Sequence, residues 1–208
     1  MNAFGPDPKA FFDDVYRNAA PWDIGSPQPA LVELFAAFPP TDPVLDVGCG
    51  SGDLAIYLAE HGHEVTGVDF AEVGIELARR KSLALPRDVS ERLTFRVADA
   101  LAPDRLGRQF GTVVDSGFLH VLDQKARDTF AESLARTLAP GGRYYLLAFA
   151  TEFDMPNTPR KVTEEELRTR FEFARGWVVH SIRPAEFLST FAPVPAIAAC
   201  FERRMPST

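Results

Sequence analysis

Apolar residues along this chain follow two patterns that alternate with one another. Short runs rich in β-branched or aromatic residues predict strands, at residues 44–47, 64–68, 93–97, 110–116, 143–149, 177–182 and 196–201. Apolar residues at helical spacing predict helices, at residues 9–17, 30–38, 71–80, 126–138 and 163–173, with one more opening at about residue 54. Strands that alternate with helices favour a parallel sheet covered on both faces. The pattern predicts a three-layer α/β/α sandwich with a mostly parallel seven-stranded sheet and an antiparallel last strand.

The central feature of the chain is a glycine-rich turn between the first strand and the next helix. The strand, Val-Leu-Asp-Val, is bounded by proline and glycine, as is typical of a short buried parallel strand. Gly48, Gly50 and Gly52 then allow a tight turn whose backbone can approach a ligand, because no Cβ stands in the way. The second strand ends at Asp69. Strand, turn, helix, strand and acid form the first half of a Rossmann-like nucleotide-binding sheet.

The glycine spacing and two acids distinguish between possible ligands. Dinucleotide-binding turns have the spacing G-x-G-x-x-G and place a pyrophosphate at the start of the helix. Here the spacing is G-x-G-x-G, and Asp46 lies two residues before the turn, where its charge would repel a pyrophosphate and suits a cation. Asp69 is placed to accept hydrogen bonds from ribose hydroxyls. A ribose and a positive charge without phosphates describe S-adenosylmethionine.

The sequence LDVGCGSGDLAIYLAEHGHEVTGVD resembles the first motif and the following acid of the class I S-adenosylmethionine-dependent methyltransferases. The resemblance implies that S-adenosylmethionine is the cofactor and S-adenosylhomocysteine the product. It also implies that the cofactor contacts the motif, at Asp46, Gly48, Cys49, Gly50, Asp69 and Phe70. Phe70 can equally be a core residue. The alternative is an α/β domain that does not bind this cofactor.

Two later segments resemble further cofactor-binding motifs of the same family. Asp99, followed by Ala100, stands after the third strand, where an acid of the family binds the adenine amino group. The alternative is a loop aspartate that caps its own turn. Asp115 and Ser116 end the fourth strand and, with His120, resemble the fourth motif of the small-molecule members. Because ligands of open α/β sheets bind outside the carboxyl ends of the strands, we expect this segment to face the sulfonium and the methyl acceptor.

Residues 20–29 contain three prolines and predict an ordered loop. Within the loop, the sequence WDIG followed by QP resembles the entrance segment of thiol, thiopurine and tellurite-resistance methyltransferases. The resemblance places Trp22 beside the methionine end of the cofactor. It also makes residues 1–30 a lid on a single domain that spans residues 1–208. The alternative is that Trp22 only packs on the domain edge. Residues before about Asp7 are expected to be frayed.

The candidate walls of an acceptor site are mostly aromatic. Several of the 17 phenylalanines fall in the N-terminal segment and the late loops, where a methyltransferase builds its acceptor lid. We expect substrate contacts from Phe12, Tyr16, Trp22, Phe118, His120 and Phe153, with Phe11, Phe187 and Phe191 as further wall residues. Each phenylalanine alone is more often a core residue. These walls favour a small, flat, apolar acceptor, such as a heteroaromatic phenol or thiol, methylated on O, S or N.

The candidate catalytic residues are His120 and Asp115, at the end of the fourth strand. His120 lies about one helical turn beyond Asp115, where the acceptor is expected. An imidazole titrates near neutrality, so it can take a proton from a phenol or an N–H group as the methyl arrives. The alternative is a histidine that orients the loop through a backbone hydrogen bond.

Composition narrows the range of partners. The length of 208 residues suits one α/β domain, and the net charge of −7 argues against a nucleic-acid substrate, because phosphate binding favours a basic surface. The fourth strand also lacks the Asn/Asp-Pro-Pro-Tyr sequence with which amino-methylating nucleic-acid enzymes hold an exocyclic nitrogen. No apolar run reaches 18 residues and no signal pattern opens the sequence, so we expect no membrane partner.

The cysteines and histidines indicate the compartment of the protein and whether it binds a metal. Cys49 and Cys200 offer no disulfide framework and fit a reducing interior, so we expect a cytoplasmic protein. The four histidines are scattered, and no metal site is expected. The sequence does not predict an oligomeric state. Two other function classes stay open: a Rossmann-like protein that holds S-adenosylmethionine or its product without methyl transfer, and a nicotinamide-dependent oxidoreductase, which the glycine spacing disfavours.

Overall fold

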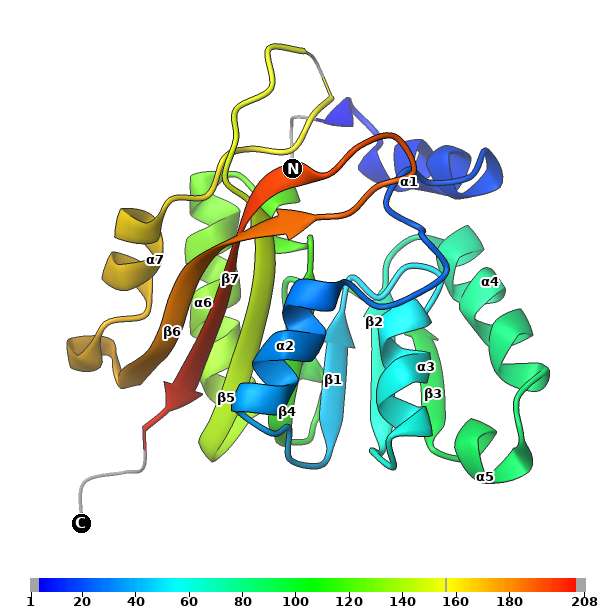
Figure 1. The fold of residues 1–208 in the computed structure, drawn as a ribbon, viewed down its shortest axis with the longest axis horizontal. Helices are drawn as coiled ribbons and strands as arrows, with labels where there is room; N and C mark the ends of the chain where they lie inside the picture. The colour runs from blue at the N-terminus through cyan, green and yellow to red at the C-terminus, as the bar shows by residue number, and fades with distance from the viewer. Residues whose placement is uncertain (1–3, 156, 205–208) are drawn as a thin grey trace.

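A parallel sheet forms the centre of the protein. A computed structural model describes residues 4–155 and 157–204, and the sheet in these residues has seven strands in the order β3-β2-β1-β4-β5-β7-β6 (Figure 1). β1 (Val44–Val47) lies between β2 (Val65–Asp69) and β4 (Phe110–Ser116), and β3 (Leu93–Val97) and β5 (Leu138–Phe149) flank them in parallel. β7 (Val194–Arg203) runs antiparallel between β5 and β6 (Trp177–Phe187). The predicted sheet is confirmed.

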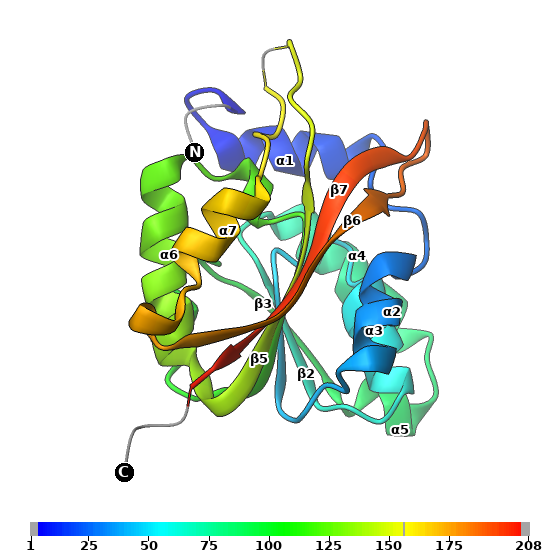
Figure 2. The same cartoon turned by 60° about the vertical axis from the view of Figure 1, so that its left-hand side comes forward.

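Helices cover both faces of the sheet and complete the three predicted layers (Figure 2). α2 (Pro29–Ala37), α3 (Asp53–Glu60) and α4 (Glu72–Leu83) lie on one face, and α6 (Gln124–Thr137) and α7 (Glu164–Arg170) lie on the other. Successive strand residues point to opposite faces, so Val44 packs in one hydrophobic core and Leu45 in the other. A short α5 (Arg87–Ser90) that the sequence did not predict follows α4. In the part of the chain that the structure describes, no helix is both long and apolar enough to cross a membrane.

The C-terminal strands are longer than the sequence predicts. β6 continues to Phe187 and β7 begins at Val194, so the connection shrinks to residues 188–193. Pro184 makes the end of β6 look like a loop, yet an edge strand tolerates proline because its outer N–H groups pair with no neighbour. β5 likewise begins at Leu138, and its pairing with β4 is interrupted before it resumes at Arg143, since Pro140 lacks the N–H that a ladder needs.

α1 (Pro8–Arg17) lies across the carboxyl ends of the central strands and is attached to α4 (Figure 2). The carboxylate of Asp13 accepts the backbone N–H of Val73 at 2.9 Å, in the first turn of α4, where helix N–H groups lack partners of their own. Phe4 is buried against Phe11 and Phe12, with ring centroids 5.3 and 5.0 Å apart. The expectation of fraying before Asp7 is therefore wrong at Phe4, because two aromatic rings of α1 anchor it, and residues 1–3 lie outside the described residues.

Arg127 of α6 is a fully buried cation that joins four segments of the chain. Its guanidinium donates two hydrogen bonds of 2.8 and 2.9 Å to the carboxylate of Glu166 in α7. It also donates to the carbonyl oxygens of Leu119, Arg160 and Lys161. Losing this group would leave Glu166 paired with Arg170 alone and would remove the guanidinium donor from the carbonyls of Arg160 and Lys161.

We expect Arg127→Met to cost about 1.5–3 kcal/mol of the free energy of unfolding, because it removes buried hydrogen bonds to a charged group while Arg170 still pairs with Glu166. Arg136→Met is the matched control, since Arg136 is exposed and pairs with Asp104 on the surface, where an ion pair contributes about 0–1 kcal/mol. Urea titrations followed by circular dichroism measure both values. Equal losses in the two variants would show that the Arg127 cluster does not hold the fold together.

Candidate active site

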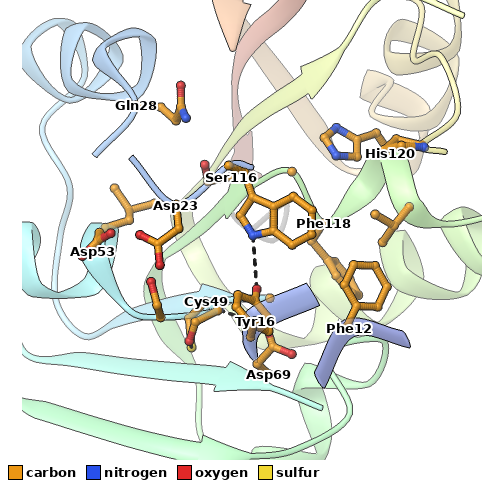
Figure 3. Close-up of a pocket in the computed structure, with 18 of the residues that line it drawn as sticks. Phe12, Tyr16, Asp23, Gln28, Cys49, Asp53, Asp69, Ser116, Phe118 and His120 are labelled. Atoms are coloured by element: carbon orange, nitrogen blue, oxygen red, sulfur yellow. Dashed lines mark hydrogen bonds between the residues drawn. The ribbon is translucent and has the colours of Figure 1, made fainter. Parts of the chain in front are cut away.

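A cavity lies at the carboxyl ends of the central strands, between them and α1. Figure 3 shows its two sides: Asp23 and Asp53 lie on one, and Phe118 and His120 lie on the other. Phe149 and Phe187 also line the cavity, and their rings contact the ring of His120. We call the group Phe12, Phe118, His120, Phe149 and Phe187 the aromatic end, and the glycine turn with Asp46 and Asp69 the turn end. Both lie where open α/β sheets bind ligands.

The glycine turn brings backbone atoms directly to the cavity. Gly48, Gly50 and Cys49 line it, as the sequence predicted. Gly50 has a φ of +52°, a left-handed conformation that favours glycine. A Cβ at Gly50 would also collide with the hydroxyl of Tyr16, which comes down from α1 onto the turn. Glycine is therefore required at this position for both the turn and the close approach of α1.

Asp69 is fixed at the end of β2. One carboxylate oxygen accepts the N–H of Gly50 at 2.9 Å and the other accepts the N–H of Ala71 at 2.8 Å. Each oxygen retains acceptor capacity toward the cavity, which suits a vicinal diol such as the ribose hydroxyls. Phe70 lines the cavity beside it and meets the ring of Phe12 edge to face at 5.6 Å.

Asp46 is an incompletely paired acid in the cavity wall. Its side chain is buried, and Oδ2 has no hydrogen-bond partner among the described residues. Burial raises the pKa of the Asp46 carboxyl well above its usual range, and the charges of Asp115 and Asp69 raise it further. A buried polar atom without a partner is costly. The turn end can therefore hold a cationic group, which is what S-adenosylmethionine would bring to it.

The loop of residues 20–29 covers this end of the cavity and is tied to the β6–β7 connection. The amide side chain of Gln28 both donates to the carbonyl of Leu188 and accepts its N–H, at 2.9 and 2.8 Å. Thr190 N–H donates to the carbonyl of Pro21. Trp22 lines the cavity and donates its indole N–H to the hydroxyl of Tyr16 at 3.3 Å. The entrance motif quoted from the sequence contains Gln28, but its spacing alone could not reveal the partner 160 residues away.

An acidic pair beside the loop is also missed by the sequence reading. Lys81 of α4 donates to Asp53 at 2.6 Å and to Ser51 at 2.9 Å, and it lies 3.6 Å from Asp23. Asp23 belongs to the covering loop and Asp53 follows the glycine turn, so Lys81 joins the two. Asp23 lies in the entrance segment WDIG and Asp53 lies in the glycine motif. Their places in these two motifs were the sequence feature that could have marked them as site residues.

His120 is buried at the aromatic end, and both edges of its ring have defined surroundings. Nδ1 accepts the backbone N–H of Phe149 at 3.1 Å, and the two rings stack at 4.1 Å. Since Nδ1 is an acceptor, the neutral imidazole carries its proton on Nε2. Burial lowers the pKa of His120 to about 3, and the charge of Arg127 adds to the effect. This arrangement opposes the predicted general base and matches the alternative, a histidine bonded to the backbone.

Asp115 does not line the cavity. Its carboxylate accepts the N–H groups of Phe118 at 2.7 Å and Leu119 at 3.1 Å, and the hydroxyl of Tyr144 at 2.8 Å. Burial raises the pKa of Asp115 to about 7, although these hydrogen bonds act in the opposite direction. Asp115 fixes the segment that carries Phe118 and His120, whereas its neighbour Ser116 lines the cavity.

Four other predicted residues lie outside the cavity lining, and Phe4 is an addition to it. Asp99 is exposed, and its carboxylate accepts the N–H of Leu101, as in the alternative of a turn cap. Ala100 is a core residue. Phe153 contacts the ring of Phe149, and Phe191 is 85% exposed in the β6–β7 connection. The local sequence around an exposed phenylalanine looks the same as the sequence around a buried one. Only the folded structure shows which of them lines the cavity.

The chain belongs to the class I S-adenosylmethionine-dependent methyltransferases. This family agrees with the sheet order, the glycine turn, and the acids Asp46 and Asp69 in β1 and β2. Residues 44–142 match the family model of a methyltransferase domain. The chain is 36% identical over 184 residues to the 2-heptyl-1-hydroxyquinolin-4(1H)-one methyltransferase of Mycobacteroides abscessus, covering 84% of this chain and 79% of that protein. S-adenosylmethionine is therefore the cofactor, and the nicotinamide-dependent alternative is set aside.

Two further comparisons agree with this assignment. The chain is 26% identical over 149 residues to probable thiol methyltransferase 2 of Arabidopsis thaliana, covering 71% of this chain and 65% of that one. Among solved structures, one described by the conversion of a disulfide bond into a thioacetal group during echinomycin biosynthesis superposes with a TM-score of 0.80. Its sequence is 32% identical, and the match covers 96% of this chain and 94% of that chain.

We expect Asp69→Asn to weaken S-adenosylmethionine binding at least about tenfold, or 1.4 kcal/mol, because a charge-assisted hydrogen bond contributes about 1.5–3 kcal/mol. The introduced amide would keep one acceptor oxygen for a backbone N–H, so the fold should survive. Isothermal titration calorimetry measures the dissociation constant, and Asp99→Asn in parallel tests whether the exposed acid contributes at all. An unchanged constant in Asp69→Asn would remove this residue from the cofactor site.

The raised pKa of Asp46 predicts that cofactor binding is coupled to proton release. Below that pKa the free protein holds a proton on Asp46, whereas pairing with a cation requires the carboxylate. Affinity for S-adenosylmethionine should therefore rise with pH below the raised pKa, as long as the α-amino group of the cofactor, with its pKa of about 7.7–8.0, stays charged. Calorimetry in buffers of different ionisation enthalpy measures the released proton. Asp46→Asn should remove it, and a coupling that survives this substitution would point to another group.

Fluorescence can report whether the loop of residues 20–29 responds to the cofactor. Trp22 lines the cavity, while the other tryptophan, Trp177, is buried against Phe171 at the start of β6. The emission change on adding S-adenosylmethionine should be lost in Trp22→Phe and kept in Trp177→Phe. A full response in Trp22→Phe would mean that the loop only packs against the domain.

Proposed function

We propose that this protein transfers the methyl group of S-adenosylmethionine to an O, S or N atom of a small, flat, aromatic or heteroaromatic molecule. The observation that carries the proposal is the continuity of the cavity: the turn end suits a ribose and a cation, and the aromatic end adjoins it. Apolar pockets with a few placed polar groups are typical of small-molecule sites. At the aromatic end, the imidazole of His120 is the polar group among four phenylalanine rings.

The relatives support an acceptor of this kind. One is named for a hydroxylated quinolone, a flat heteroaromatic ring, and another for thiols. The solved structure concerns sulfur chemistry on echinomycin. These names differ in the kind of acceptor, so the proposal covers a class of small acceptors rather than one compound, and its flat ring rests on the aromatic end and on the quinolone relative.

The residues of this chain would divide the work between binding and alignment. Asp69 would hold the ribose and Asp46 the cationic part of the cofactor, while Trp22 and Tyr16 would close the cavity above it. The bound cofactor supplies a methyl group already activated on a cationic sulfur. The aromatic end would exclude water and orient the acceptor, and alignment of this kind contributes about 7–11 kcal/mol to lowering a barrier.

The setting of the enzyme is part of the proposal. We infer that residues 1–30 act as a lid on one domain, because α1 and the loop of residues 20–29 supply Tyr16 and Trp22 to the cavity. The net charge of −7 disfavours a nucleic-acid substrate, and a free Cys49 in the cavity lining favours the reducing cytoplasm.

A turnover assay tests the proposal. The purified protein is incubated with S-adenosylmethionine and a panel of acceptors: 1-hydroxyquinolin-4-ones, phenols, aromatic thiols and N-heterocycles. Formation of S-adenosylhomocysteine together with a methylated ring, detected by mass spectrometry, is the expected result. Binding of S-adenosylmethionine without methylation of any acceptor would instead favour a cofactor-binding protein that transfers no methyl group.

A further inference from the structure

We propose that His120 selects the acceptor as a hydrogen-bond donor through Nε2–H, and that the acceptor binds already ionised, as the anion of an acidic ring hydroxyl or a thiol. This inference rests on the proposed function and specifies its substrate class. In this scheme no side chain acts as a catalytic base, and the acceptor must be acidic enough to ionise in solution.

The hydrogen bond at Nδ1 fixes the orientation of the His120 imidazole. Nδ1 is occupied by the N–H of Phe149, and a backbone amide can only donate. Nε2 bonds to no described residue, yet it is not among the fully enclosed atoms without a partner. The ring edge with Nε2 lies over Gly117, whose missing side chain leaves that edge uncovered: a Cβ there would be 3.3 Å from Nε2. His120 and Gly117 both line the cavity, so we infer that the N–H bond of Nε2 faces it.

The groups around the His120 ring keep the imidazole neutral. Arg127 lies behind His120 on α6, donates to the carbonyl of the adjacent Leu119, and opposes protonation of the imidazole. From the sheet, Phe149 and Phe187 contact the ring, and neither carries charge. His120 O accepts the backbone N–H of Arg160. The imidazole thus stays neutral near pH 7, with one donor facing the substrate.

The described residues that line the cavity offer no other base at the aromatic end. Asp69 is committed to two amides, and Asp23 and Asp53 lie beside Lys81. Burial raises the pKa values of Cys49 and Tyr16 well above their usual ranges, so both keep their protons. Asp46 lies in β1, at the end that suits the cofactor's cation. Among the described lining residues, no group is left at the aromatic end to remove a proton from a weakly acidic acceptor.

The chemistry balances without a base. The acceptor loses its proton to solvent before binding, and Nε2–H donates to the resulting anion, which retains lone pairs for attack. The anion forms a bond to the methyl carbon while the carbon–sulfur bond of the sulfonium breaks. The electron pair of that bond stays on sulfur, which leaves a neutral thioether and a neutral methylated product.

The pH dependence of kcat/KM distinguishes this scheme from a general base. A series of ring-substituted acceptors with different pKa values is assayed with the wild-type enzyme from about pH 5 to 9. We expect kcat/KM to rise to a plateau at a pH that shifts with the acceptor's pKa, because the rate follows the anion. A base would require the protonated acceptor, so its rate would fall above the acceptor's pKa. That fall, or a midpoint that stays constant across the series, would overturn the inference.

Two substitutions separate the two edges of the ring. His120→Asn offers an oxygen at the δ position for the N–H of Phe149 but no donor at the ε position. His120→Gln offers an amide donor at the ε position. We expect His120→Asn to lower kcat/KM about 10- to 100-fold with unchanged affinity for S-adenosylmethionine, and His120→Gln to recover part of the loss. Full activity of His120→Asn, or no recovery in His120→Gln, would contradict the donor role.

These outcomes are independent of a failure of the proposed function. If no acceptor in the panel is methylated although S-adenosylmethionine binds, then the methyl-transfer proposal itself fails. If acceptors are methylated but their rates do not follow the anion, then methyl transfer stands and only the assignment of His120 fails.

Discussion

Burial of carboxylates at adjacent strand ends is the constraint on which this site depends. Asp115, Asp46 and Asp69 end or nearly end β4, β1 and β2, and all three are buried. Asp115 and Asp69 are satisfied by backbone N–H groups, which fixes the segments that follow them. Asp46 retains an oxygen without a partner among the described residues. A low-dielectric pocket that leaves one acid uncompensated favours a cation, and this separates the turn end from a pyrophosphate site of similar backbone shape.

The cavity is assembled from segments far apart in the sequence. α1 and the loop of residues 20–29 close over the strand ends, Gln28 ties that loop to the β6–β7 connection, and Lys81 ties it to the glycine turn. The same closure brings the rings of α1 toward the aromatic end. Cofactor and acceptor would therefore be enclosed by one set of contacts, which is how a methyltransferase can rely on alignment and exclusion of water rather than on proton transfer.

The sequence predicts features encoded locally and misses features that depend on distant partners. The strand, glycine turn, helix and Asp69 follow from a contiguous pattern, so they were predictable. The direction of Asp115 toward Tyr144, and the bond from Phe149 to His120, join residues 29 positions apart and were not. Phe4 and Phe191 also could not be told apart from the sequence. Phe4 is buried because it packs against α1, whereas Phe191 is exposed. The long β6 was missed because proline is read as a strand breaker, whereas an edge strand accommodates it.

In the proposed complex, one cavity holds a cation at the turn end and an acceptor anion on His120 Nε2 at the aromatic end. The most direct measurement is a crystal structure of the complex with S-adenosylhomocysteine and the acceptor that is methylated fastest. We expect the ribose on Asp69, the acceptor's oxygen or sulfur within hydrogen-bonding distance of Nε2, and Nδ1 still bonded to Phe149. An acceptor seated away from His120, or an imidazole turned so that Nδ1 faces the acceptor, would contradict it.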